Sequence, residues 1–456
     1  MRITRHYLTI GGRRVHYRRA GKGPPLLMVH QSPRSSAEYE DLMLRWGSEF
    51  TCIAPDTPGF GQSDPLGKAD PDINDYADAV VEFARALGLA HTAAYGFHSG
   101  GIILVTALKR HPELFSGLAV GGYAIWTPQE MAIFGEAYLP PFRPSLYGEH
   151  LPWLWHRIME QSWFFPWFDV RDGARLPGAH DDPARVHAIV MEMLDAGDAY
   201  RAGYGAVLRA PRDIPPADAV TPPVLISAYD GDPLQAHIDR LGAMPAGWSA
   251  QKVATAAEHQ AISLAFLRAN AGPKVDYYAE DDDAGFVPVV SEGFDGQIHW
   301  QGRGDYVSAH GPGSEGPLVE APNGVRIDLP GHGLSSDWLG EAPNWMLPWH
   351  DVGTAAAEAL TGSTSFSIPI PLPLVGEPQR LFPDLTPDRH GNYLTTAWSI
   401  VRARHFFSPW YEAKAANASA FDSATITPER LAREHRALLR ATSAQALAQA
   451  LQQQDD

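Results

Sequence analysis

Cysteine and long apolar runs are both scarce in this sequence. Cys52 is the only cysteine among 456 residues, which excludes an intrachain disulfide and a cysteine-based zinc finger. Its apolar neighbours are typical of a buried strand, so we expect an inert core thiol. The N-terminus has no apolar signal segment, and no apolar run approaches the roughly 20 residues that cross a bilayer. We therefore expect a cytoplasmic protein with no membrane partner.

Basic residues are also in deficit. The chain has 36 Lys and Arg against 53 Asp and Glu, a formal net charge of -17. This balance repels phosphate backbones and anionic lipids, so nucleic acid is excluded as an expected partner. Homo-oligomerisation stays open. Hydrophobic residues make up 45% of the chain, enough for more than one sizeable core.

The first part of the chain alternates short apolar runs with helical patterns, which is typical of a largely parallel sheet covered by helices on both faces. One helix is expected after Asp75, a candidate N-cap. Residues 123–210 form an aromatic-rich, helix-leaning insertion, after which the strand pattern returns. The expected strands are 14–18, 26–30, 51–54, 93–96, 118–121 and 223–228.

The second half of the chain repeats the first. Turn glycines, prolines and aromatics match in the same order across three blocks, which helical patterns alone would not do by chance. The matched blocks are 298–311 with 15–31, Asp328–Ser335 with Asp56–Ser63 (an offset of 272) and Pro383–Leu394 with Pro140–Leu151 (an offset of 243).

The fall in offset means that about 29 residues are missing from the second copy, between Leu360 and Pro383. The run IPIPLPL (368–374) stands there instead, and its prolines cannot open a helix of the kind that follows the nucleophile turn in the first copy. The second copy also has no counterpart of Asp232 or His259. We expect a degenerate repeat without an active site, docked cap to cap on the first domain.

Five motifs of the first half occur in a fixed order. They are Met28-Val-His-Gln31, Asp56-Thr-Pro-Gly-Phe-Gly-Gln-Ser63, Gly96-Phe-His-Ser-Gly-Gly101, Tyr229-Asp-Gly-Asp-Pro233 and Glu258-His259. In this order they resemble the α/β-hydrolase superfamily, most closely its proline-iminopeptidase and C–C-bond hydrolase branches. The resemblance implies an α/β fold: an α/β-hydrolase domain over 1–272 with a helical cap at about 123–210. A truncated α/β-hydrolase-like repeat with cap-like C-terminal helices would follow over 273–456.

The resemblance also implies a nucleophile on a sharp strand-to-helix turn, in the pattern G-x-nucleophile-x-G-G. Anchoring on Gly96, Gly100 and Gly101 puts His98 at the nucleophile position. The other register makes Ser99 the nucleophile but puts Phe97 where a small residue is needed. We favour His98 as the nucleophile or as an additional acid/base group; the alternative is a histidine that fills an inactive turn.

By the same resemblance, His259 is the general base and Asp232 the carboxylate that orients it, with Asp230 as the competitor. The backbone N–H groups of Gln31 and Ser99 would form the oxyanion hole. His30 is expected to be structural, with a minor role in the site.

These residues predict an enzyme that cleaves an ester, an amide or an activated C–C bond in a small hydrophobic or aromatic molecule, without a cofactor. Cap aromatics such as Trp126 should line its cleft. Three alternatives stay open: a cofactor-free lyase or oxygenase, a zinc site built from His30, His98 and His259, and a non-catalytic ligand-binding protein. We expect no metal, because the sequence lacks the clustered spacing of a dedicated zinc motif.

Overall fold

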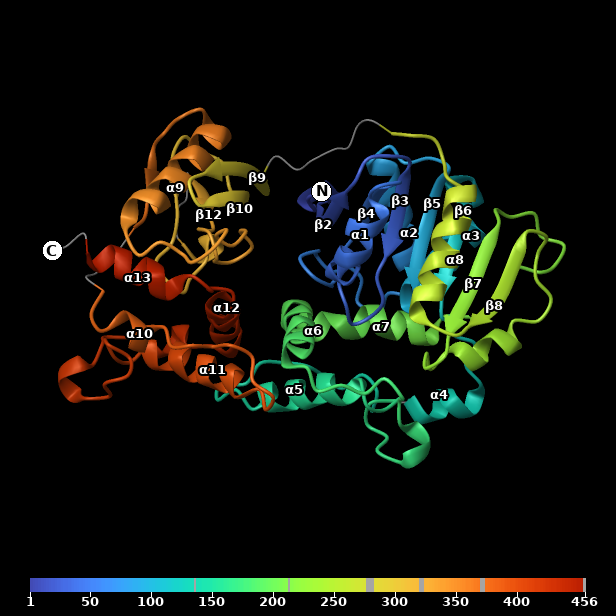
Figure 1. The fold of residues 1–456 in the computed structure, drawn as a ribbon. Coiled ribbons are helices and arrows are strands. Elements are labelled where there is room, and N and C mark those ends of the chain that lie inside the picture. Colours follow the sequence, from blue (N-terminus) through green and yellow to red (C-terminus); the bar gives the residue numbers. More distant parts are fainter. Residues whose placement is uncertain (135–136, 212–213, 276–282, 320–323, 370–373, 454–456) are drawn as a thin grey trace. The chain divides into compact units, whose positions relative to one another are not determined.

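The computed structural model describes residues 1–134, 137–211, 214–275, 283–319, 324–369 and 374–453. The chain divides into two compact units, each built from two stretches of chain (Figure 1). The first unit comprises residues 1–143 and 156–280, and the second comprises residues 144–155 and 281–456. The boundary near residue 273 that the sequence suggested therefore misses twelve residues of the expected cap, which pack with the second unit.

An eight-stranded sheet forms the centre of the first unit, in the order β1-β2-β4-β3-β5-β6-β7-β8. The pairs β1–β2 and β2–β4 are antiparallel, and the other neighbours are parallel. The six expected strands all lie within this sheet. Its strands are β1 (Thr4–Ile10), β2 (Arg13–Ala20), β3 (Pro25–Val29), β4 (Thr51–Pro55), β5 (Thr92–Phe97), β6 (Phe115–Gly121), β7 (Val224–Tyr229) and β8 (Trp248–Val253).

Helices cover both faces of this sheet (Figure 1). Side chains of α2 (Ile73–Ala86) and α3 (Ser99–Arg110) belong to one apolar core. Those of α1 (Glu40–Trp46) and α8 (Ala256–Ala269) belong to another core, which includes Cys52. Helix α2 begins three residues earlier than expected, because Asp72 is its N-cap and Asp75 completes a capping box.

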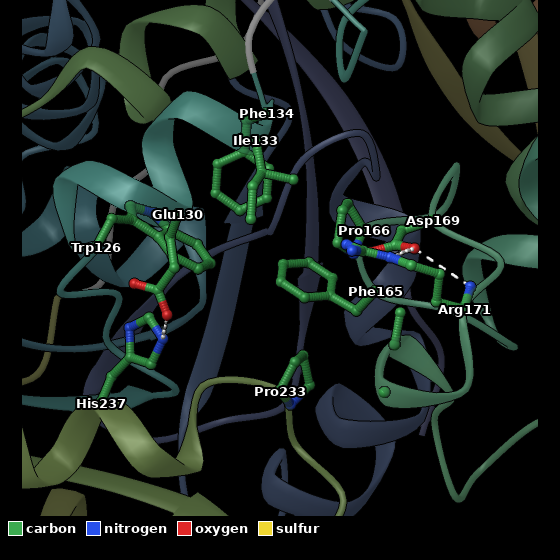
Figure 2. A pocket seen from close by; sticks show the side chains of 12 residues that line it. Trp126, Glu130, Ile133, Phe134, Phe165, Pro166, Asp169, Arg171, Pro233 and His237 are labelled. Atoms are coloured by element: carbon green, nitrogen blue, oxygen red, sulfur yellow. Dashed lines mark hydrogen bonds and ion pairs between the residues drawn. The ribbon is translucent and has the colours of Figure 1, made fainter.

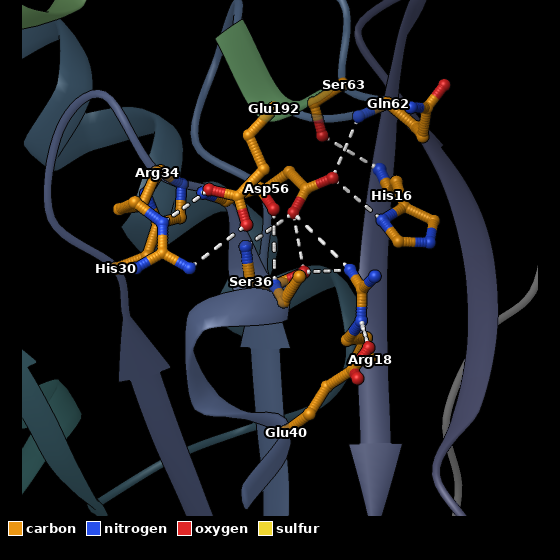
Figure 3. A network of polar contacts seen from close by, with 12 residues as sticks. His16, Arg18, His30, Arg34, Ser36, Glu40, Asp56, Gln62, Ser63 and Glu192 are labelled. Atoms are coloured by element: carbon orange, nitrogen blue, oxygen red, sulfur yellow. Dashed lines mark hydrogen bonds and ion pairs between the residues drawn. The ribbon is translucent and has the colours of Figure 1, made fainter. Parts of the chain in front are cut away.

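The cap of the first unit lies between β6 and β7 in sequence. Its helices are α4 (Pro128–Phe134), α5 (His150–Gln161), α6 (Pro183–Ala196) and α7 (Tyr200–Arg209). Residues 150–155 of α5 belong to the second unit. Helix α6 is tied to the sheet domain by Arg34, whose Nε donates to Glu192 over 2.6 Å (Figure 3). Gln62 Nε2 also donates to Asp195 over 2.8 Å. These bonds fix the cap relative to the loops at the carboxyl edge of the sheet.

The second unit has a five-stranded sheet with the order β9-β10-β12-β11-β13. This order matches β1-β2-β4-β3-β5 of the first sheet, and each pair of neighbours has the same relative direction. The strands are β9 (Ala284–Ser291), β10 (Phe294–Gln301), β11 (Val307–Ser308), β12 (Val325–Ile327) and β13 (Phe366–Ser367).

Each of the two sheets has its own buried polar network around an aspartate, and Figure 3 shows that of the first sheet. In the first, Asp56 accepts from His16 Nδ1 and from the Gln62 and Ser36 N–H groups, each over 2.8 Å. In the second, Asp328 accepts from His299 Nδ1 over 2.8 Å. It also accepts from the N–H groups of Leu334 and Gly316, over 2.8 and 2.6 Å. Strand order and hydrogen bonding therefore agree between the two sheets.

Helices complete the second unit. They are α9 (Met346–Thr361), α10 (Pro378–Leu381), α11 (Asn392–Arg404), α12 (Pro428–Leu439) and α13 (Ala444–Gln452). Part of the IPIPLPL run, 370–373, lies outside the described residues. Within the described ranges, no helix combines the length and apolar character needed to cross a bilayer.

Candidate active site

His98 lies at the corner between β5 and α3. Its backbone has φ 48° and ψ −113°, a positive φ that non-glycine residues rarely adopt. The flanking glycines permit this sharp turn: a Cβ at Gly100 would lie 1.9 Å from the Val29 carbonyl oxygen, and one at Gly96 would lie 2.7 Å from Gly100. Ser99 is the first residue of α3. The corner position is therefore held by the histidine.

Asp232, in the loop after β7, is hydrogen-bonded to this histidine. His98 Nε2 donates to Asp232 Oδ1 over 3.0 Å. The carboxylate is buried, which acts to raise its pKa, but the charge and hydrogen bond of His98 and the Leu234 N–H lower the pKa of Asp232 on balance. The nearby Asp230 is engaged by Gln235 instead. Asp232 and His98 thus form a dyad in which the carboxylate holds the imidazole.

The second ring nitrogen of His98, Nδ1, has no hydrogen-bond partner among the described residues. The side chain is 23% exposed. Because Nε2 carries the proton that Asp232 accepts, a neutral His98 has its lone pair on Nδ1. This nitrogen is the one free to meet a substrate or a water molecule.

His259 differs from the expectation that Asp232 would orient it. Both of its ring nitrogens bond to other groups: Nδ1 lies 2.8 Å from Ser227 Oγ and Nε2 lies 2.9 Å from Tyr95 Oη. Burial lowers the pKa of His259 to about 4, so the ring is neutral at pH 7. The connection between β8 and α8 has only two residues, which places His259 in the first turn of a capped helix.

The ring of Phe97 lies beside both histidines. It stacks on His98 with ring centroids 4.2 Å apart, and it meets His259 edge-on at 5.7 Å. A single substituent at Gly121 would collide with Phe97 and His259. Phe97 therefore fills the space that an imidazole on α8 would need in order to reach the corner between β5 and α3.

One of the two expected oxyanion-hole donors is engaged within the protein: the Gln31 N–H donates to Glu38 over 3.0 Å. The next N–H, of Ser32, donates to the Ser99 hydroxyl over 2.5 Å. Ser32 is thus a site residue that our sequence analysis missed, although it directly follows the motif that ends at Gln31. A substrate oxygen would have to displace the Ser99 hydroxyl to reach the Ser32 N–H.

His30 is buried in a structural position. Its Nδ1 donates to the Gln31 carbonyl over 2.9 Å, and its Nε2 accepts from the Thr57 N–H over 2.9 Å. In the part of the chain that the structure describes, no group of three or more His, Cys, Asp or Glu side chains is placed to hold a metal ion. The histidines of the zinc alternative, His30, His98 and His259, each bond to other groups.

Elemental analysis of the purified full chain is accordingly expected to find well below one zinc or iron per chain, because a stable site needs at least three convergent ligands. Dialysis against a chelator should leave any activity unchanged. About one ion per chain, lost when His98 is replaced by alanine, would contradict this prediction and support a metal-dependent reaction.

His98 lines a small cavity of about 50 Å³ under the cap. Its walls are mostly apolar and aromatic. Beside His98 they consist of Ser32, Ser99, Ile102, Ala124, Trp126, Phe134, Tyr138, Phe165, Tyr204, Val207, Leu208, Pro233 and Leu234. The cap aromatics expected to roof the site, including Trp126, are therefore in contact with it.

A larger outer pocket of about 480 Å³ shares Trp126, Phe134, Phe165 and Pro233 with this cavity (Figure 2). Trp126 and Phe165 are stacked with centroids 5.9 Å apart, so aromatic rings stand between the two spaces. The charges of the outer pocket are paired with each other or with neighbours. Glu130 pairs with Arg240 over 2.8 Å, and Asp169 pairs with Arg171 over 2.6 Å.

Residues 24–140 match the family model described as alpha/beta hydrolase fold. The resemblance inferred from the motifs is thus confirmed, and the first unit has this fold. Among curated proteins, haloalkane dehalogenase 2 of Mycobacterium tuberculosis is 31% identical over 120 residues, 26% of this chain and 42% of that protein. The 2-(acetamidomethylene)succinate hydrolase of Mesorhizobium japonicum is 36% identical over 105 residues, 23% of this chain and 37% of that protein.

The chain thus spans about two-fifths of the length of these relatives. Similar solved structures include a thermophilic esterase from Thermogutta terrifontis, with 16% identity and a TM-score of 0.44 over 60% of this chain and all of that one. E-2-(acetamidomethylene)succinate hydrolase has 23% identity and a TM-score of 0.41, over 59% of this chain and 97% of that one.

Proposed function

We propose that the first unit is a hydrolase in which Asp232 orients His98. His98 then either attacks the carbonyl carbon of the substrate itself or activates a water molecule that attacks it. The hydrogen bond of 3.0 Å between His98 Nε2 and Asp232 Oδ1 carries this proposal. It places a histidine–carboxylate pair at the corner where this fold presents its nucleophile. The names of the relatives, a haloalkane dehalogenase and a hydrolase of 2-(acetamidomethylene)succinate, support hydrolysis of a small molecule.

The chemistry follows from the tautomer. With the Nε2 proton bound to Asp232, the Nδ1 lone pair of His98 can attack a carbonyl carbon to give a tetrahedral adduct. The bond to the leaving group then breaks, and water hydrolyses the resulting acyl-imidazolium to release the acid and the free histidine. The same lone pair can equally take a proton from water as the oxygen adds to the carbonyl, and return that proton to the leaving group. Both routes pass through an imidazolium, which the Asp232 carboxylate stabilises. His259 has no part in either route, because its two ring nitrogens bond to Ser227 and Tyr95.

The two spaces around His98 suggest the shape of the substrate. The inner cavity, at about 50 Å³, accommodates only the end of a substrate that lies against His98. The outer pocket is about ten times larger, and the aromatic rings of Trp126 and Phe165 line both spaces. The proposed substrate is therefore a hydrophobic or aromatic molecule that extends past these rings, with its reacting group in the inner cavity and the remainder in the outer pocket.

A second candidate is proton abstraction without an acyl intermediate, as in a cofactor-free lyase or oxygenase. The specific observation in its favour is that the Gln31 and Ser32 N–H groups already have acceptors, Glu38 and the Ser99 hydroxyl. Removal of a proton needs a base such as His98, but it does not need a vacant oxyanion hole. Binding without turnover would instead indicate a ligand-binding protein.

A panel of 4-nitrophenyl esters tests the first candidate. The full chain is expected to release 4-nitrophenol, and Asp232→Asn is expected to lower kcat by ~10- to 100-fold, because the amide cannot stabilise the imidazolium. Asp230→Asn is the matched control, since that carboxylate bonds to Gln235 and not to His98. Equal losses in both variants, or no turnover of any ester, would contradict hydrolysis by the dyad.

A further inference from the structure

Arg157, on α5, is buried in the cap with no acidic partner among the residues that the structure describes. Its side chain is among the largest fully enclosed ones, with 2% of the residue exposed. The guanidinium lies 5.3 Å from the ring centre of Trp167 and 5.9 Å from that of Tyr200. Its one hydrogen bond among the described residues joins Nη1 to Gln161 over 3.0 Å, and Nε has no partner.

A buried cation in this state is unfavourable unless a negative charge comes near. Burial lowers the pKa of Arg157, but a guanidinium stays charged in proteins. Aromatic rings offset part of the desolvation through cation–π contact without neutralising the charge. The cap therefore contains a positive charge that no described carboxylate compensates.

This charge lies behind one wall of the inner cavity. Trp167, over which Arg157 packs, donates its indole N–H to the Tyr138 carbonyl over 3.3 Å. Tyr138 and Tyr204 both line the cavity that contains His98, and their hydroxyl oxygens are 2.8 Å apart. Two hydroxyl groups that share one hydrogen bond leave one hydrogen without an acceptor. This wall offers a hydrogen-bond donor backed by positive charge, and no described group accepts from it.

We propose that the ligand of the inner cavity carries a carboxylate, which accepts from the Tyr138–Tyr204 pair while Arg157 acts as its counter-charge. The proposal rests on the proposed function and adds the chemical class of the substrate: a hydrophobic molecule with an anionic group. Two arginines in or next to the outer pocket are less suited to this role. Arg171, which lines the pocket, is exposed and paired with Asp169, and Arg240 is paired with the lining residue Glu130.

Isothermal titration of the full chain with acid–amide pairs tests this proposal. The probes are phenylacetate with phenylacetamide, and hexanoate with hexanamide, measured in a His98→Asn background so that no probe is turned over. At least one acid should bind ~10-fold or more tightly than its amide, as expected for a charge-assisted hydrogen bond near a buried cation. Equal affinities within both pairs would overturn the proposal.

Substitutions locate the charge that is responsible. Arg157→Met should remove the preference for the acid and leave amide affinity within ~2-fold, whereas Arg157→Lys should retain most of the preference. Arg171→Met, in the outer pocket, is the matched control and should change neither affinity. Loss of the preference in Arg171→Met, with Arg157→Met unaffected, would overturn the assignment.

Tyr204→Phe covers the case in which Arg157→Met does not fold, because it keeps the ring and removes only the hydroxyl. It should weaken acid binding ~5- to 10-fold without changing amide binding; equal weakening of both would contradict the proposal. The binding readout is independent of turnover. Acid-selective binding in a chain that hydrolyses no ester would refute the hydrolase proposal alone.

Discussion

Replacing His98 by alanine is expected to lower kcat for a turned-over ester by at least ~100-fold, the scale for loss of a nucleophile or an acid–base group. Replacing Ser99 by alanine should change kcat by less than ~5-fold, because its hydroxyl accepts from the Ser32 N–H and no catalytic role is assigned to it. Steady-state kinetics of the two variants on the same ester make the comparison.

The backbone at His98 calls for a second variant. Alanine tolerates φ 48° poorly, so a loss of activity could reflect a disturbed turn. Asparagine adopts positive φ more readily, and His98→Asn should keep the wild-type melting temperature while losing activity to the same extent. An inactive Ser99→Ala chain together with an active His98→Ala chain would show that the serine is the nucleophile.

The turn itself was predictable from glycine spacing. Gly96 and Gly100 stand where a side chain would collide with backbone atoms, so only this residue type fits. Steric exclusion of this kind is recorded directly in the sequence. Aligned with the pattern G-x-nucleophile-x-G-G that the family resemblance implies, these glycines placed His98 at the corner.

The partner of Asp232 was not predictable in the same way. Sequence order places Asp232 after β7 and His259 after β8, but it does not say which imidazole the carboxylate meets. That choice depends on the ring of Phe97, which fills the space between the histidines, and on the short link into α8. Both are properties of side-chain packing across three elements, which periodicity does not report.

Edge elements were also missed. β1 and β8 lie at the two edges of the first sheet, and β8 alternates only weakly, with three exposed residues among six. Strands with one open side need no continuous apolar run, so their pattern resembles that of a loop. The central strands, buried on both faces, gave the clear signals.

The division within the cap had no sequence signal either. Residues 144–155 pack with the second unit. There the indole N–H of Trp398 donates to the Leu146 carbonyl over 3.3 Å, and that of Trp155 donates to the Arg389 carbonyl over 3.1 Å. Trp155 and Trp398, which correspond under the sequence offset of 243, thus both make contacts inside one unit. The offset was visible in the sequence, but the shared location of the two side chains was not.

These contacts give the second large expected effect. A fragment of residues 273–456 lacks Leu146 and Trp155, so Tyr393 and Trp398, both buried in the full chain, would lose the side chains that cover them. Two-residue strands at β11 and β13 add little sheet pairing. We expect this fragment to be aggregated or to lack near-UV circular dichroism, since a small unit with an opened core cannot offset its chain entropy.

In the full chain, the same contacts can be tested by single substitutions. Trp398→Ala is expected to destabilise the second unit by about 3–5 kcal/mol, the scale for emptying a buried tryptophan site. Trp345→Ala is the matched control, because Trp345 is 54% exposed and its loss should change stability by less than ~0.5 kcal/mol. Urea unfolding followed by circular dichroism measures both. The opposite result is a 273–456 fragment that unfolds cooperatively with the same free energy of unfolding as the second unit of the full chain. That result would show that residues 144–155 are dispensable for the stability of this unit.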